Sequence, residues 1–169
     1  SLGRRFGTAM SERPRYSTRD LPPYTYVPGQ QPHPISYPRG HIHGAEPPDP
    51  PPLEPENCSD SESYLYAVDL FNHGFFWEAH EAWESLWIVA GRRGLLAEFL
   101  KGLIKLAAAG VKELEGNPTG VERHRARAIE LLSGVESDSD VFCGIELTTL
   151  LNRVRSARDI SDIGLSLNL

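Results

Sequence analysis

Proline is distributed very unevenly along this chain of 169 residues, and its distribution limits where helices can form. Thirteen of the fourteen prolines lie at or before Pro55, and only Pro118 follows. Proline lacks an N–H donor and blocks helix interiors, so a proline-rich segment adopts turns and polyproline II. We therefore predict an extended or partly disordered Pro/Tyr-rich arm over residues 1–56 and a folded domain over residues 57–169. Because the arm also carries tyrosines and aliphatic side chains, we expect part of it to lie on the domain.

Apolar residues recur in the domain at the three- and four-residue spacing of amphipathic helices. The pattern predicts helices from Ser59 or Ser61 to Asn72, Phe75 to Ala90, Gly94 to Leu114, Pro118 to Leu132 and Gly144 to Arg158. No alternating strand pattern stands out, and the short connections favour antiparallel neighbours. The predicted fold class is all-α, a compact bundle of about five helices.

The second predicted helix contains the most informative residues, within the run FNHGFFWEAHEAWESLW at residues 71–87. At about 100° per residue, His80 lies beside Trp87 on the apolar side, with Glu84 one turn later at its edge. The same geometry points Glu78 and Glu81 away from that side. An imidazole and a carboxylate placed partly inward cost desolvation energy unless they pair with each other, with another group or with a metal.

This run resembles the signature of the bacterial and archaeal domain of unknown function 309 family, condensed to His-x-x-x-Glu-x-x-Trp. His80, Glu84 and Trp87 fill the three condensed positions. Downstream, FLKGLIKLAAAGVKELEGNPTGV is similar to a second family motif, with Lys105 where glutamine is usual. The resemblance implies a small all-helical protein of prokaryotic origin in which the His-x-x-x-Glu motif binds a metal. It does not imply any particular reaction.

A divalent metal, either zinc, iron or manganese, accepts imidazole and carboxylate ligands. His80 and Glu84 are one helical turn apart and can reach a common point, but two ligands are too few for a tight site. His124, on the inward face of the fourth predicted helix, is the candidate third ligand. His41 or His43 of the arm is a candidate fourth ligand.

A metal at this position would support hydrolysis by activating water, with Glu81 or Glu84 carrying the proton as catalytic residue. Candidate residues for a surrounding pocket are Asn72, Trp77, Glu78 and Trp87. The protease motif His-Glu-x-x-His is excluded because Glu84 replaces its second histidine.

The alternative is a non-catalytic structural or interaction module, in which His80 and Glu84 form a buried polar network that specifies helix packing. A lone inward histidine is more often hydrogen-bonded to protein than bound to metal. Two hypotheses therefore remain, a metal-assisted site and a polar core network. They predict different metal contents for the same protein.

Charge and cysteine content limit the partners of the protein. The formal net charge of −6 disfavours general nucleic-acid binding, which requires lysine and arginine to neutralise phosphates. No apolar run approaches the ~18 residues of a membrane span. Two cysteines make no disulfide framework, so we expect a cytoplasmic protein with no nucleic-acid or membrane partner. A small-molecule or protein partner and a homo-oligomer both remain open.

Overall fold

The computed structural model describes residues 13–30 and 48–169, which form an all-α bundle as predicted. Its helices are η1 (Pro55–Asp60), α2 (Glu62–Asn72), α3 (Phe76–Val89), α4 (Leu95–Leu114), α5 (Pro118–Glu136), α6 (Leu147–Ser156) and η2 (Ile160–Asp162). Strands β1 (Val141–Phe142) and β2 (Ile145–Glu146) form a small antiparallel hairpin between α5 and α6.

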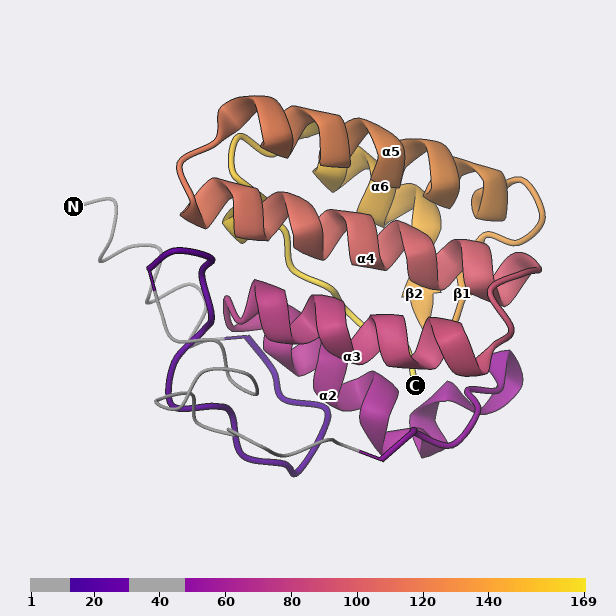
Figure 1. Ribbon diagram of the computed structural model, residues 1–169. Helices are drawn as coiled ribbons and strands as arrows, with labels where there is room; N and C mark the ends of the chain where they lie inside the picture. Colours follow the sequence, from indigo (N-terminus) through magenta and orange to yellow (C-terminus); the bar gives the residue numbers. More distant parts are fainter. Residues whose placement is uncertain (1–12, 31–47) are drawn as a thin grey trace.

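The long helix α4 organises the bundle, because it packs against α3 on one side and α5 on the other. Figure 1 shows these three helices side by side, with α6 behind α5 and α2 beneath α3. The C-terminal segment returns from α6 past the helices to the hairpin, where the Asn168 N–H donates to the Gly144 carbonyl at 2.7 Å.

The helix boundaries follow local capping chemistry. Ser61 caps α2 by accepting a hydrogen bond from the Tyr64 N–H, and Asn117 caps α5 by accepting one from the Gly120 N–H. Gly74, at φ +86°, adopts the left-handed conformation that separates α2 from α3. The predicted starts of the helices before residue 120 lie no more than two residues from the observed ones.

Two predicted boundaries were wrong. Helix α5 extends past Leu132 to Glu136, because Val135 continues the buried stripe of that helix and is fully buried. Helix α6 begins at Leu147 rather than Gly144, because Cys143 (φ +47°) and Gly144 (φ +77°) form the turn of the hairpin instead. The hairpin itself was not predicted, since each strand has only two residues.

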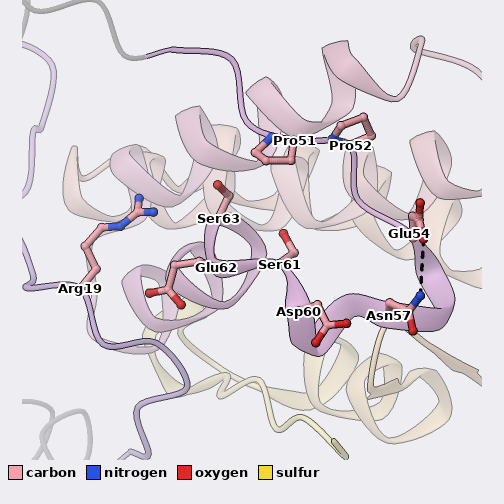
Figure 2. Close-up of a pocket in the computed structure, with 9 residues that line it drawn as sticks. All are labelled: Arg19, Pro51, Pro52, Glu54, Asn57, Asp60, Ser61, Glu62 and Ser63. Atoms are coloured by element: carbon pink, nitrogen blue, oxygen red, sulfur yellow. Dashed lines mark hydrogen bonds between the residues drawn. The ribbon is translucent and has the colours of Figure 1, made fainter.

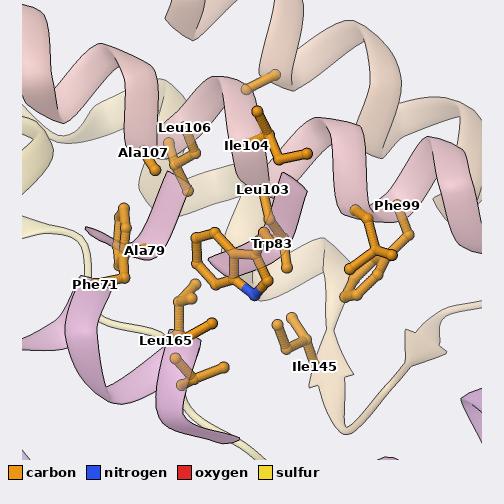
Figure 3. Packing of buried hydrophobic residues seen from close by; sticks show 14 of the residues in the cluster. Phe71, Ala79, Trp83, Phe99, Leu103, Ile104, Leu106, Ala107, Ile145 and Leu165 are labelled. Carbon is orange, nitrogen blue, oxygen red and sulfur yellow. The ribbon is translucent and has the colours of Figure 1, made fainter. Parts of the chain in front are cut away.

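The core is built around Trp83, which is fully buried at the centre of α3. Figure 3 shows its indole enclosed by side chains from several elements, with Phe71, Leu103, Ile145 and Leu165 among them. The indole Nε1 has no hydrogen-bond partner among the described residues, so Trp83 contributes packing rather than a polar contact. Helix α3 is therefore held in position by the packing of its apolar side.

Residues 13–30 of the arm lie against α2 and α3, as the apolar content of the arm predicted. The fully buried carboxylate of Asp69 accepts hydrogen bonds from Arg15, Tyr16 and Ser17. Farther along, the Tyr66 hydroxyl donates to the Asp20 carbonyl at 2.8 Å. The arm thus covers one flank of the helical pair through specific polar contacts.

Candidate functional site

Helix α3 places three polar side chains together on its outer surface, His80, Glu81 and Glu84. The Nδ1 atom of His80 lies 3.5 Å from Glu81 Oε1, and its Nε2 atom lies 3.6 Å from Glu84 Oε2. One donor atom from each of the three residues lies within 4.8 Å of the other two. We call these three residues the His/Glu cluster.

The cluster is partly exposed rather than buried. The side chain of His80 is 27% exposed, that of Glu84 is 37% exposed and that of Glu81 is 52% exposed. Both His80–carboxylate distances exceed the usual hydrogen-bond length of about 2.7–3.2 Å. The geometry therefore leaves the imidazole nitrogens without a well-formed partner inside the cluster.

Glu81 joins this cluster although the helical wheel pointed it away from His80. The backbone direction is as predicted, but a glutamate side chain has three rotatable bonds and can turn back along the helix surface. As a result, the His80 ring has a carboxylate beside each nitrogen. Glu81 was predicted as a proton carrier and is also placed to act as a ligand.

His124 was predicted as the third ligand, and the structure places it on α5, half-buried, outside the cluster. Burial, followed by the positive charges of Lys105 and Lys112, lowers the pKa of His124, with a smaller contribution from His80. The candidate arm ligands His41 and His43 lie outside the described residues.

Cationic side chains border the cluster on α4. Lys101 Nζ lies 4.2 Å from the centroid of the Trp87 ring, a cation–π contact. Lys105 makes no ion pair among the described residues. Burial lowers the pKa of Lys105, and the positive charges of Lys101 and Arg127 lower it further, whereas the negative charge of Glu84 raises it. The negative charge of the cluster is therefore partly balanced by α4.

The four candidate pocket residues have separate surroundings. Trp87 is half-buried beneath Lys101, whereas Trp77 packs edge-on against Tyr26 of the arm, with ring centroids 4.9 Å apart. Asn72 is buried and holds the C-terminal segment, donating to the Leu165 carbonyl at 2.9 Å and accepting from its N–H at 2.7 Å. The Asn72 side chain is therefore hydrogen-bonded to backbone groups of the protein itself.

Glu78 was predicted to point outward, and this was wrong, because it is only 9% exposed. Its Oε1 accepts a hydrogen bond from the Thr25 hydroxyl at 2.7 Å, and its Oε2 accepts one from the Tyr26 N–H at 2.8 Å. The outward side of α3 is covered here by the arm, which a wheel drawn for the isolated helix cannot show. Glu78 therefore anchors the arm.

Burial of Glu78 predicts an unusual pH dependence. Desolvation raises the pKa of Glu78 above its ordinary value of 4.5, against the hydrogen bonds from Thr25 and Tyr26 that lower it. Because the folded-state pKa is the higher one, protonation favours folding, and this contribution to stability grows as pH falls through the raised pKa. In Glu78→Gln, both hydrogen bonds can persist, because the Thr25 hydroxyl can accept from the amide.

We therefore expect Glu78→Gln to unfold at pH 7.5 with a free energy equal to that of the wild type or higher by up to ~1 kcal/mol. The advantage should shrink as pH falls through the raised pKa of Glu78, where the wild-type carboxyl gains its proton. Urea titrations at several pH values measure this, with the exposed Glu98→Gln as control. A difference between Glu78→Gln and wild type that is constant with pH would contradict the assignment.

A surface hollow lies away from the His/Glu cluster. Figure 2 shows it between the arm and the start of α2, with a volume of about 390 Å³ and Arg19, Pro51, Asp60 and Glu62 among its lining residues. Its lining mixes one arginine with three carboxylates, and the Glu62 carboxylate already accepts a hydrogen bond from the Thr18 N–H. The candidate chemistry of the protein is thus on α3 and not in this hollow.

Fold and site together define a small all-helical domain with a half-exposed histidine–carboxylate cluster on one helix. Residues 64–124 match the family described as a domain of unknown function, DUF309. The matched segment includes the whole cluster, and the resemblance inferred from the sequence is confirmed. No curated protein matches the chain. None of the helices among residues 13–30 and 48–169 is long and apolar enough to cross a membrane.

Proposed function

We propose that this protein binds a divalent transition metal through His80, Glu81 and Glu84. The observation that carries the proposal is the convergence of three donor atoms within 4.8 Å of one another on consecutive turns of α3. Imidazole and carboxylate ligands suit zinc, iron and manganese, and small rotations of these half-exposed side chains suffice to bring them to bonding distance.

The hydrogen-bonding environment of His80 supports the same proposal. Its Nδ1 atom is buried and has no hydrogen-bond partner among the described residues. A histidine that binds a metal through one ring nitrogen commonly turns the other towards a carboxylate. With Glu81 beside Nδ1 and Glu84 beside Nε2, either ring nitrogen can bind while the other faces an acceptor.

The alternative hypothesis of a buried polar network fits less well. The three side chains are a quarter to a half exposed, and an exposed ion pair contributes only about 0–1 kcal/mol. The helix is already held by Trp83 and its apolar neighbours, so the cluster is not needed to specify packing. The metal content of the purified protein separates the two hypotheses.

Three protein ligands leave coordination positions open. A metal held there would lower the pKa of a bound water to near 7 and so supply a hydrolytic nucleophile. Glu81 is the most exposed of the three residues, and the carboxylate oxygens of Glu81 and Glu84 that do not face His80 are available to accept a proton. We propose a cytoplasmic location, where a chain with two free cysteines keeps its thiols reduced.

We expect the wild-type protein, stripped with chelator and reloaded with Zn²⁺ or Mn²⁺, to retain about one ion per chain after gel filtration. His80→Ala and Glu84→Gln should each weaken binding more than about 100-fold, because each removes a direct ligand. Elemental analysis gives the stoichiometry, and titration calorimetry gives the affinity.

His124→Ala is the control that distinguishes the observed cluster from the wider ligand set predicted from the sequence. It should keep its metal, since His124 lies outside the cluster. Loss of metal in His124→Ala would instead add α5 to the site. A wild type that stays free of metal after reloading, with His80→Ala merely less stable, would establish the polar-network alternative.

A further inference from the structure

The two cysteines of this chain lie far apart in the sequence and meet in the fold. Cys58 lies in η1, and Cys143 lies at the turn between β1 and β2. Both are buried and unpaired by any disulfide, and their side chains are hydrogen-bonded to each other. The two thiols of the sequence therefore contact each other inside the fold.

The hydrogen bonds around the two thiols have a defined direction. The Cys58 Sγ–H donates to the Pro55 carbonyl at 2.9 Å, so the proton shared between the two sulfurs is donated by Cys143. This contact lowers the pKa of the Cys58 thiol and, with burial, raises the pKa of the Cys143 thiol. Cys58 is therefore the thiol that more readily becomes a thiolate, which is the nucleophilic form.

The two thiols also differ in how firmly their backbones are held. The carbonyl of Cys143 accepts a hydrogen bond of 2.7 Å from the buried Tyr64 hydroxyl, which fixes the hairpin turn against α2. Cys58 lies in a six-residue 3-10 helix whose Asn57 departs from helical geometry (φ −131°, ψ 37°) and whose other residues are mostly exposed. Local opening of η1 would expose Cys58 while Cys143 stays in place.

We propose that Cys58 and Cys143 form a reversible disulfide that fastens η1 to the β1–β2 turn under oxidising conditions. The proposal is independent of metal binding, because neither cysteine belongs to the His/Glu cluster. The oxidant belongs to the class of small disulfides, of which glutathione disulfide is the test reagent.

The exchange balances in two steps. The Cys58 thiolate attacks one sulfur of glutathione disulfide, forms a mixed disulfide and releases one glutathione thiolate. Cys143 then loses its proton to solvent, attacks the Cys58 sulfur and releases the second glutathione. The protein loses two hydrogens as two thiols become one disulfide, and one glutathione disulfide becomes two glutathiones. Excess reduced glutathione reverses both steps.

The experiment treats chelator-stripped, folded full-length protein with glutathione disulfide and maps its peptides by mass spectrometry without reduction. The expected result is a peptide joining Cys58 to Cys143, with both free thiols lost. Closing so long a loop should raise the midpoint of thermal unfolding by roughly 5–10 °C relative to the reduced protein. Reduction with dithiothreitol should restore both thiols and the original midpoint.

Two single variants test the order of the steps. Cys143→Ser should accumulate a glutathione adduct on Cys58, because the resolving thiol is gone. Cys58→Ser should react many times more slowly, because Cys143 is buried and poorly ionised. The wild-type result does not depend on how well either variant folds.

Three outcomes would overturn the proposal. The first is a wild-type protein that keeps both thiols in glutathione disulfide unless denatured. The second is linkage mainly between chains. The third is a disulfide within the chain that lowers the midpoint of thermal unfolding, which would mean that the bond strains the native structure.

Discussion

Replacing Asp69 with alanine is expected to lower the free energy of unfolding by about 3 kcal/mol, because the change removes a buried charged acceptor and strands its donors. The Asp69 side chain is 0% exposed. Its two oxygens accept four hydrogen bonds of 2.6–2.9 Å, from Arg15 Nε, the Tyr16 N–H, and the N–H and hydroxyl of Ser17. All four donors lose their acceptor if the arm stays in place.

The same substitution should release the arm from α2. Trypsin cleavage after Arg15 and Arg19 should therefore become faster in Asp69→Ala, and urea unfolding should show the loss of stability. Glu62→Ala is the matched control, since Glu62 also accepts a hydrogen bond from the arm, from the Thr18 N–H at 3.2 Å, but is exposed. Its cost should stay below ~1 kcal/mol. Equal effects of the two variants would show that Asp69 does not anchor the arm.

The pH dependence of Asp69 has the opposite sign to that of Glu78. Burial alone would raise the pKa of Asp69, but the hydrogen bonds from Ser17, Arg15 and Tyr16 together hold it below the ordinary 3.8. This contribution to stability is fully present above the ordinary value and is lost as pH falls through the lowered pKa. Weak acid therefore protonates Glu78 first, and stronger acid is needed to release Asp69.

The helices of this fold could be predicted from local signals, and the roles of their polar residues could not. Apolar periodicity and capping residues placed five helices, and the same periodicity identified Trp83 as core. Asp69 and Glu78 obtain their partners from an arm some 50 residues away in sequence, as the pairs Tyr16–Asp69 and Tyr26–Glu78 show. A helical wheel drawn for one helix contains no information about contacts with a segment that is distant in the sequence.

The family motif divides into two structural roles that its sequence does not separate. Asn72 and Glu78 bind backbone groups of the C-terminal segment and the arm, respectively, and so hold the chain together. His80, Glu81 and Glu84 face outward and hold none of the described chain segments through a hydrogen bond of their own side chains. Spacing alone predicted His80 with Glu84, whereas the inclusion of Glu81 depended on a side-chain rotation that spacing does not determine.

Gly110→Ala should destabilise the protein by about 3 kcal/mol, at the upper end of the cost of overpacking a core. Gly110 lies on α4 where that helix meets α3, and a Cβ atom there would overlap the ring of Phe76. Phe76 is fully buried and packs edge-on against Phe71, with ring centroids 5.2 Å apart, so the ring has no free space into which to move. The helix-propensity gain of about 1 kcal/mol from replacing glycine is therefore outweighed.

Gly134→Ala provides the matched control, because Gly134 is exposed within α5 and its added Cβ would meet nothing nearer than 3.8 Å. This variant should be more stable than the wild type by about 0.5–1 kcal/mol, so the two glycine substitutions are expected to differ in sign. Phe76→Leu combined with Gly110→Ala should cost less than the sum of the single changes, because a smaller side chain relieves the overlap. Additive losses in denaturant unfolding would mean that Gly110 is required for a reason other than close approach of α3 to α4.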